Sequence, residues 1–316
     1  MIKTFYPIII PTLCRFEHFK RCVESLVCNT HADKTELVIG LDYPPSEKYR
    51  EGYEKIKDYI PNIKGFGKVT FFCHKTNLGA VKNWKFCENY CFEHYDAFIG
   101  TEDDNEFSPC FLDYMNKALE KYALDDKIES IGGWTPEIMY SEEYGCYLDY
   151  SSTAWGVGRW RHKEERYKNK LIGNGFVIDS LLNNRVVFEM LKECPKRLNN
   201  DLNMLKRGED WGDVKRGVLM QVFGLSQLRP CISLVRNIGN DGSGLHCKIE
   251  EKYAKQRISN NISFDMECKV AGSNFEKLDQ LRRLNIPNNF FIKIAFYSII
   301  IFKYIVFRVK YIRKDL

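Results

Sequence analysis

The sequence predicts an α/β protein in which a mostly parallel β-sheet is flanked by helices and an amphipathic helix follows at the C-terminus. The first reason is that short, continuous apolar segments alternate with segments of helical spacing, which is typical of βαβ units. The second is a composition of 44% hydrophobic and 28% charged residues over 316 positions, which is ordinary for a folded protein. That composition excludes disordered, collagen-like and disulfide-scaffold proteins.

The apolar runs and the helical spacing place each element along the first half of the chain. Strands are expected at 6–10, 36–41, 69–73 and 97–100, and helices at 16–27, 47–59, 80–92 and 111–122. After residue 127 the pattern changes. We expect a short strand with a glycine turn at 131–134, an aromatic and glycine-rich segment at 155–160, and a helix that begins at the polar turn 208–213.

Cysteine usage indicates the compartment. The chain has 12 cysteines without a Cys-x-x-Cys pair, and its N-terminus lacks the long apolar core of an export signal. We therefore expect reduced thiols in a cytoplasmic protein, and we expect Cys87 and Cys91 to be small buried thiols on one helix.

Acidic residues directly follow two of the predicted strands. Asp42 follows 36–41, and Glu102, Asp103 and Asp104 follow 97–100. Ligands of parallel sheets bind outside the carboxyl ends of the strands. Three adjacent carboxylates repel one another unless a cation or hydrogen-bond donors meet them, and their hard oxygens suit Mg²⁺ or Mn²⁺ together with substrate phosphates. The alternative is an ordinary solvated acidic turn.

The residues around this acidic triplet carry a family resemblance. The segment Phe-Ile-Gly-Thr-Glu-Asp-Asp at 98–104 resembles the metal-binding strand end of GT-A glycosyltransferases, which have a Rossmann-like fold. It is most similar to the Glu-Asp-Asp version found in the N-acetylglucosaminyltransferase I type. The segments 10–12, 41–42 and 76–79, together with Asn83, resemble family 2 glycosyltransferases.

The resemblance implies an inverting, metal-dependent hexosyl- or N-acetylhexosaminyltransferase. Such an enzyme moves a sugar from a nucleotide diphosphate-sugar, with a UDP-sugar favoured, to a glycan or lipid-linked acceptor in surface polysaccharide synthesis. Asp104 would hold Mn²⁺ or Mg²⁺, and His246, in a loop similar to the one that closes over the diphosphate, is a second candidate ligand. The residues implied to line the nucleotide-sugar site are Pro11, Thr12, Arg15, Asp42, Asn77, Asn83, Glu102, Asp103 and Ser243.

Transfer also needs a general base for the acceptor hydroxyl. Glu209, Asp210 and Asp213 flank Trp211 at a polar turn, which would present carboxylates beside an aromatic face. The resemblance to an Asp-Asp-Trp segment selects Asp210, with Asp213 and Glu209 as alternates. Capping of the following helix by acidic residues is the other interpretation.

The aromatic segment at 155–160 also has two interpretations. Trp155 and Gly156, with Trp160, would shape the floor of the sugar pocket, or they belong to the hydrophobic core. Two other functions remain open for the whole chain: a sugar nucleotidyltransferase and a non-catalytic membrane-associated scaffold. The nucleotidyltransferase is disfavoured because 11–16, directly after the first strand, contains no glycine.

The net charge of +5 lies in the tail. Six of the 47 bases and one of the 42 acids follow residue 288, which leaves 41 of each before it and argues against a nucleic-acid partner. The residues expected to share one apolar helical face are Ile294, Ser298, Ile301, Ile305, Val309 and Ile312. This pattern predicts a helix on the anionic inner face of a membrane. The alternatives are a helix packed on protein and a membrane span.

These observations give a domain organisation. We expect a GT-A catalytic domain at 1–247, with a nucleotide-binding half at about 1–125 and an acceptor half at about 126–247. A strap or linker would follow at 248–288, and the basic membrane-surface helix at 289–316.

Overall fold

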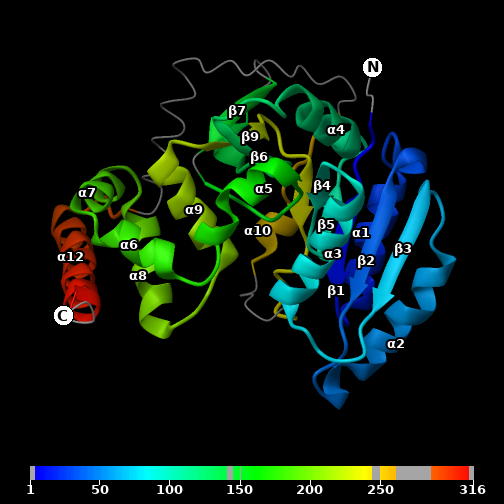
Figure 1. Ribbon diagram of the computed structural model, residues 1–316, viewed down its shortest axis with the longest axis horizontal. Coiled ribbons are helices and arrows are strands. Elements are labelled where there is room, and N and C mark those ends of the chain that lie inside the picture. Colours follow the sequence, from blue (N-terminus) through cyan, green and yellow to red (C-terminus); the bar gives the residue numbers. More distant parts are fainter. Residues whose placement is uncertain (1–3, 141–144, 150, 244–249, 261–285, 313–316) are drawn as a thin grey trace. The chain divides into compact units, whose positions relative to one another are not determined.

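The computed structural model describes residues 4–140, 145–149, 151–243, 250–260 and 286–312 (Figure 1). The chain divides into two compact units. The first unit contains the described residues of 1–148, 153–165 and 227–269, and the second contains those of 149–152, 166–226 and 270–316. His246 and most of the predicted strap at 248–288 lie outside the described residues.

The elements follow the predicted alternation. The strands are β1 (Ile8–Thr12), β2 (Glu36–Leu41), β3 (Lys68–Cys73), β4 (Ala97–Gly100), β5 (Asn105–Phe107), β6 (Ile128–Gly132), β7 (Cys146–Asp149), β8 (Val157–Trp160), β9 (Ser226–Pro230) and β10 (Val235–Asn237). The helices are α1 (Phe16–Val27), α2 (Arg50–Tyr59), α3 (Ala80–His94), α4 (Phe111–Lys121), α5 (Arg161–Tyr167), α6 (Gly175–Leu182), α7 (Asn184–Glu193), α8 (Pro195–Arg207), α9 (Gly212–Phe223), α10 (Glu251–Ala254) and α12 (Phe290–Ile312).

A mostly parallel sheet forms the centre of the first unit, which confirms the predicted α/β class. Its strand order is β3-β2-β1-β4-β8-β6-β9-β7. β1 pairs in parallel with β2 and β4, and β2 pairs in parallel with β3, whereas β8 runs antiparallel to β4 and β6. A separate antiparallel ribbon joins β5 to β10.

The first strand lies two residues later than predicted. The predicted range stops before Pro11, but Pro11 lies within β1 opposite Gly40, and the ladder continues through Thr12. The amide of Asp42 donates a hydrogen bond to the Thr12 carbonyl at 2.9 Å, so the pairing persists beyond the proline. This shift places Thr12 at the carboxyl edge of the sheet.

Helices cover both faces of the sheet, which explains why its strands are continuously apolar. Ile8 and Ile10 pack into one core with residues of α1, α2 and α4, whereas Ile9 packs into a second core with Cys87 and Cys91 of α3. Both thiols are fully buried, as predicted, and burial raises the pKa of Cys87 to about 12. Alternation along the strand therefore fixes which helix each residue meets.

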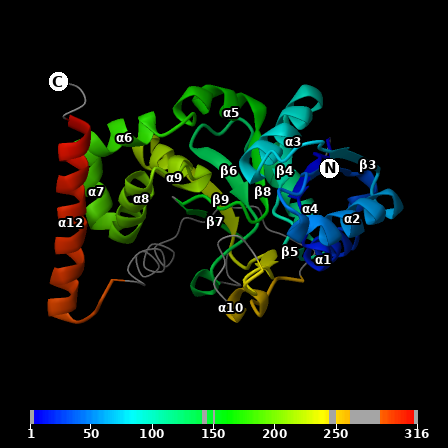
Figure 2. The same ribbon diagram turned by 90° about the horizontal axis from the view of Figure 1, so that it is seen from below.

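The second unit is helical. Buried side chains of α6, α7, α8 and α9 form its core, and Ile300 and Phe307 of α12 belong to that core. Figure 2 shows α12 alongside α7 and α8. The Lys303 ammonium donates a hydrogen bond to Asn199 of α8 at 2.7 Å, and Arg308 donates one to Asn184 of α7 at 2.6 Å.

The other side of α12 is apolar and exposed. All six residues predicted to share one face, Ile294, Ser298, Ile301, Ile305, Val309 and Ile312, are exposed. α12 has 23 residues and contains an 18-residue window of mean hydropathy 2.0, so it is long and apolar enough to cross a membrane. The membrane span that the sequence left as an alternative is therefore possible by length and composition.

Candidate active site

Two carboxylates and one arginine meet at the carboxyl edge of the sheet, in the first unit. Because β1 and β4 are parallel neighbours, the residues that follow them lie together. The Arg15 Nη2 nitrogen lies 2.6 Å from Asp103 Oδ1 and 2.7 Å from Asp104 Oδ2. Thr12 donates its hydroxyl to Asp103 Oδ2 at 2.7 Å. Two carboxylate oxygens from different residues thus converge on one cationic nitrogen.

Burial controls the electrostatics of this group. Burial raises the pKa of Asp103, and Asp104 adds to the shift while Arg15 opposes it. Burial alone would lower the pKa of Arg15, but Asp103 and Asp104 outweigh it and hold the pKa of the guanidinium above its ordinary value. The Arg15 Nη1 nitrogen is buried and has no hydrogen-bond partner among the described residues. A buried donor without a partner costs free energy, which a bound anion or water that reached it would recover.

The ribbon strand β10 completes the surroundings of Asp104. Asn237 donates a hydrogen bond to Asp104 Oδ1 at 2.7 Å, and the amide of Ile238 donates to the Asp104 carbonyl at 2.8 Å. A Cβ on Gly239 would lie 1.9 Å from Asp104 Oδ2, so no larger residue fits there without displacement. Sequence reasoning identified this loop but missed Asn237. The available signal was a polar residue at the end of a short strand, two positions before a glycine.

Glu102 contacts a different partner from Asp103 and Asp104. Its carboxylate accepts a hydrogen bond from Trp155 Nε1 at 2.9 Å. Trp155 makes edge-to-face contacts with Trp134 and Tyr253, each with ring centroids 5.2 Å apart. The sequence interpretation singled out Trp155 but missed Trp134 and Tyr253, which only the fold brings to it.

Gly156 and Trp160 also make contacts that the fold requires, and a role of Gly156 in the sugar pocket stays a prediction. Gly156 has φ of +67°, and a Cβ there would lie 2.8 Å from the Phe111 ring, so glycine is required by conformation and by space. Trp160 is buried and donates its Nε1 hydrogen to the Leu119 carbonyl at 2.9 Å. For Trp160, the hydrophobic-core alternative is therefore correct.

The Asp42 carboxylate stabilises the turn before α3 through hydrogen bonds. It accepts hydrogen bonds from the amides of Tyr43, Leu78 and Gly79 at 2.8–2.9 Å and from the Asn77 side chain at 3.2 Å. Asn77 also donates to the Tyr43 carbonyl at 2.6 Å. Contact between Asp42 and a nucleobase stays a prediction.

Asn83 is buried between α3 and β2. It donates a hydrogen bond to the Gly40 carbonyl at 2.8 Å, and its oxygen lies 3.0 Å from a His74 ring nitrogen. A Cβ on Gly40 would lie 2.3 Å from that oxygen. These contacts attach α3 to the sheet, and they give Asn83 a structural role beside its predicted one.

The loop after β10 is held to α1. Ser243 donates its hydroxyl to Asp241 Oδ1 at 2.6 Å, and His18 Nε2 lies 3.1 Å from Asp241 Oδ2. Burial alone would raise the pKa of Asp241, but the hydrogen bonds from Ser243 outweigh it and lower that pKa. Ser243 is exposed at the end of a described segment.

The oxygens of Asp103 and Asp104 fit a divalent cation of the magnesium type. Mg²⁺ is usually bound through one or two carboxylates plus substrate phosphates, and Arg15 Nη2 marks the point where these two carboxylates hold a positive charge. No group of three or more His, Cys, Asp or Glu side chains that could hold a metal occurs among the described residues. His246, the other candidate ligand, lies outside the described residues, so its role stays a prediction.

The predicted bases lie in the second unit. Asp210 Oδ1 is 2.5 Å from the Lys215 ammonium, and the backbone carbonyl of Glu209 accepts a hydrogen bond from Asn174 at 2.9 Å. Trp211 precedes α9 and is 42% exposed. Asp213, in the first turn of α9, lines a cavity of about 330 Å³. Asp104 belongs to the first unit, so a joint role for Asp104 and any of these bases stays a prediction.

Comparisons with known proteins add distant similarities. No family model matches the chain, and no curated protein matches it. Among solved structures, a mannosyltransferase from Pyrobaculum calidifontis in complex with GDP-Man and Mn²⁺ is similar at 13% identity and a TM-score of 0.36, covering 51% of this chain and 46% of that chain. The S. aureus protein TarS, residues 1–349 with UDP-GlcNAc, is similar at 13% identity and a TM-score of 0.38, covering 52% and 47%. The chain thus spans about half the length of these proteins.

Proposed function

We propose that this chain is a GT-A glycosyltransferase that transfers a sugar from a nucleotide diphosphate-sugar to a hydroxyl acceptor. The observation that supports it most is the convergence of Asp103 and Asp104 on one cationic nitrogen at the carboxyl edge of a parallel sheet. A site of this kind suits the diphosphate of a donor, because it combines carboxylates that can hold a cation with a buried arginine donor. A closer relation to the N-acetylglucosaminyltransferase I type remains part of the proposal.

The proposed roles on the donor side follow the contacts. Asp103 and Asp104 would hold Mg²⁺ or Mn²⁺, which supplies Lewis-acid stabilisation of the departing diphosphate when bound. Thr12 donates a hydrogen bond to one oxygen of Asp103, and Asn237 donates one to an oxygen of Asp104. These two bonds fix the orientation of the carboxylates. Arg15 offers Nη1 to a phosphate oxygen, and Trp155 with its aromatic neighbours offers ring faces to the sugar.

Transfer with inversion requires one displacement. The acceptor oxygen forms a bond to the anomeric carbon while the bond from that carbon to the diphosphate breaks, and the diphosphate leaves with the electron pair. A carboxylate takes the proton of the acceptor hydroxyl. We propose Asp210 from the sequence register, with Asp213 and Glu209 as alternates. The cavity beside Asp213 supports Asp213 as the base, because an acceptor could reach it there. The carboxylate of Asp210 is instead paired with the Lys215 ammonium.

The test is a screen of nucleotide-sugars for slow hydrolysis, which reveals the donor without knowledge of the acceptor. The protein with Mg²⁺ or Mn²⁺ should release nucleoside diphosphate from one donor, most readily a UDP-sugar, and Asp104→Ala should abolish the release. Asp58→Ala, an exposed acid on α2, is the matched control and should retain it. The proposal is wrong if no donor is hydrolysed, or if Asp104→Ala behaves like the unchanged protein. Pyrophosphate formed from a nucleoside triphosphate and a sugar phosphate would indicate a nucleotidyltransferase instead.

We also propose that α12 holds the protein on an anionic membrane surface. One side of α12 is held to α7 and α8 through Lys303 and Arg308, while the other exposes isoleucines and valines. A helix fixed in this way favours lying along a membrane over crossing it, with its apolar side chains in the acyl boundary. Lipid-linked acceptors would then be accessible to a peripheral enzyme on the cytoplasmic face.

A further inference from the structure

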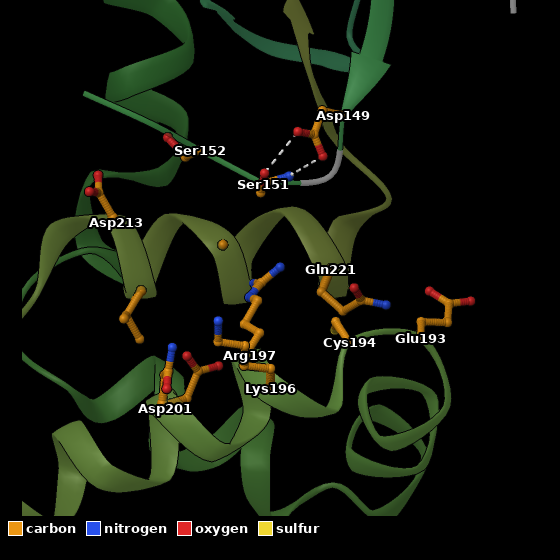
Figure 3. Close-up of a pocket in the computed structure, with 13 residues that line it drawn as sticks. Asp149, Ser151, Ser152, Glu193, Cys194, Lys196, Arg197, Asp201, Asp213 and Gln221 are labelled. Atoms are coloured by element: carbon orange, nitrogen blue, oxygen red, sulfur yellow. Dashed lines mark hydrogen bonds between the residues drawn. The ribbon is translucent and has the colours of Figure 1, made fainter. Parts of the chain in front are cut away.

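A cavity of about 330 Å³ lies within the second unit, between α8 and α9, and apart from the alternate base Asp213 none of its lining residues has a role in the proposed reaction. Lys196, Arg197 and Asp201 of α8 line one side, and Asp213 and Gln221 of α9 line the other (Figure 3). Its volume falls at the lower end of the range typical of small-molecule sites, roughly 300–1,000 Å³.

The deepest polar group of this cavity is Asp201. Its side chain is fully buried, and neither carboxylate oxygen has a hydrogen-bond partner among the described residues. Figure 3 shows the carboxylate directed from α8 into the space toward α9. Burial raises the pKa of Asp201 to about 7, although the nearby Arg197 opposes the shift. A buried carboxyl without a partner costs stability and is therefore a feature that demands a functional explanation.

Arg197 reaches across the cavity because α9 leaves room for it. A Cβ on Gly217 would lie 2.5 Å from Arg197 Nη2, so any larger residue in that turn of α9 would push the guanidinium away. Glycine inside a helix costs roughly 1 kcal/mol relative to alanine. Helix α9 therefore has its glycine at the position where the Arg197 side chain passes against it.

The charges of the lining residues select a class of ligand. The lining holds four acids (Asp149, Glu193, Asp201 and Asp213) and two bases (Lys196 and Arg197). The acids disfavour phosphates and other anions, and the two bases disfavour a simple cation. Both donors and acceptors are present, because Ser151, Asn200 and Gln221 add neutral polar groups. An uncharged molecule rich in hydroxyl groups can satisfy such a mixed set, since each hydroxyl both donates and accepts.

We propose that the cavity between α8 and α9 binds an uncharged sugar unit, and that Asp201 is the innermost side chain to hydrogen-bond its hydroxyl groups. Arg197 is the second contact, and Asp213 lies at the mouth. This proposal rests on the proposed function in one respect: it identifies the bound sugar as part of the acceptor glycan. Binding itself requires neither donor nor metal.

The experiment is saturation-transfer NMR on the full chain at pH 7 with the methyl glycosides of glucose, galactose, mannose and N-acetylglucosamine. Glucosamine and glucose 6-phosphate serve as the cationic and anionic probes. We expect saturation transfer to at least one neutral glycoside and none to the two charged probes. Asp201→Leu, which keeps a similar size but removes both oxygens, should weaken binding at least tenfold, and Gly217→Ala should also weaken it. Asp179→Leu on the exposed side of α6 should leave binding unchanged.

Three results would overturn the proposal: no transfer to any neutral glycoside, stronger binding of a charged probe, or equal binding by Asp201→Leu. Thermal unfolding of each variant establishes that it is folded, and Asp201→Asn provides a second folded variant that retains one acceptor and should bind with intermediate affinity. The assay contains no nucleotide. If the protein binds glycosides but hydrolyses no nucleotide-sugar, the proposed function is wrong and the sugar site is supported. If it hydrolyses a nucleotide-sugar but binds no glycoside, the sugar site is wrong and the proposed function is supported.

Discussion

Gly239 lies so close to Asp104 that a Cβ at position 239 would fall 1.9 Å from the Asp104 Oδ2 oxygen. The same oxygen lies 2.7 Å from Arg15, so the backbone of the loop after β10 and the guanidinium enclose it from two sides. The position of this carboxylate therefore depends on the absence of a side chain at residue 239.

Gly239→Ala should displace Asp104 and uncouple it from Arg15. Because the clash is with a carboxylate held also by Asn237, we expect at least a tenfold loss of nucleoside diphosphate binding in the presence of Mg²⁺, measured by calorimetry. Gly175→Ala is the control, since nothing lies within 4 Å of its Cβ position. Unchanged binding by Gly239→Ala would mean that Asp104 does not contact the ligand.

Removing Arg15 should make the fold depend on divalent cations. Arg15→Ala leaves two buried carboxylates without their counter-charge, which we expect to lower the free energy of unfolding by about 3 kcal/mol in EDTA. Added Mg²⁺ should restore much of this loss by taking the place of the guanidinium. Urea unfolding with and without Mg²⁺ measures the effect. Arg21→Ala, an exposed arginine of α1, should not respond to Mg²⁺, and an equal response of both variants would contradict the prediction.

Asp42→Asn should destabilise the turn at 77–79. The substitution replaces one acceptor oxygen with a donor that faces the amides of Leu78 or Gly79, and an unsatisfied buried donor costs roughly 1–3 kcal/mol. The free energy of unfolding in urea measures this, with the exposed Asp58→Asn as the reference. If the two variants are equally stable, the bracing role assigned to Asp42 is incorrect.

Asp201 should make the protein less stable as pH rises. Its pKa is about 7 in the folded protein and near 3.8 when unfolded, so between these values the folded state holds a proton that the unfolded state has released. The free energy of unfolding therefore falls as pH rises through this window, by at most on the order of 4 kcal/mol. Asp201→Asn should flatten this part of the stability profile and be the more stable protein at pH 8. If Asp201→Asn leaves the dependence of stability on pH unchanged, the Asp201 carboxyl does not cause that dependence.

Binding to vesicles should depend on the outward side of α12. Ile305→Asp puts a charge among exposed apolar residues, so we expect at least a tenfold loss of co-sedimentation with vesicles rich in phosphatidylglycerol and no loss of stability. Leu124→Asp, at an exposed site in the first unit, should bind like the unchanged protein. Equal loss in both variants would point to non-specific adhesion.

Much of the local structure could be predicted from the sequence. The helix at 16–27 and the strands at 36–41 and 97–100 have the predicted bounds, because their apolar residues repeat with the period of the element they form. The acidic triplet at the end of β4 and the outward apolar side of α12 follow from the same periodicity. These features depend on neighbouring residues along the chain, so the sequence by itself determined them.

Only the tertiary structure decided which partner each acid meets. Glu102, Asp103 and Asp104 are adjacent in sequence, yet the first pairs with Trp155, the second with Thr12 and Arg15, and the third with Arg15 and Asn237. Asn237 is 133 residues away from Asp104 along the chain and reaches it through the β5–β10 ribbon. The burial of Asp201 likewise depends on α9 packing over α8. Long-range packing of this kind leaves no periodic signal in the sequence, because the residues that create it are not neighbours until the chain has folded.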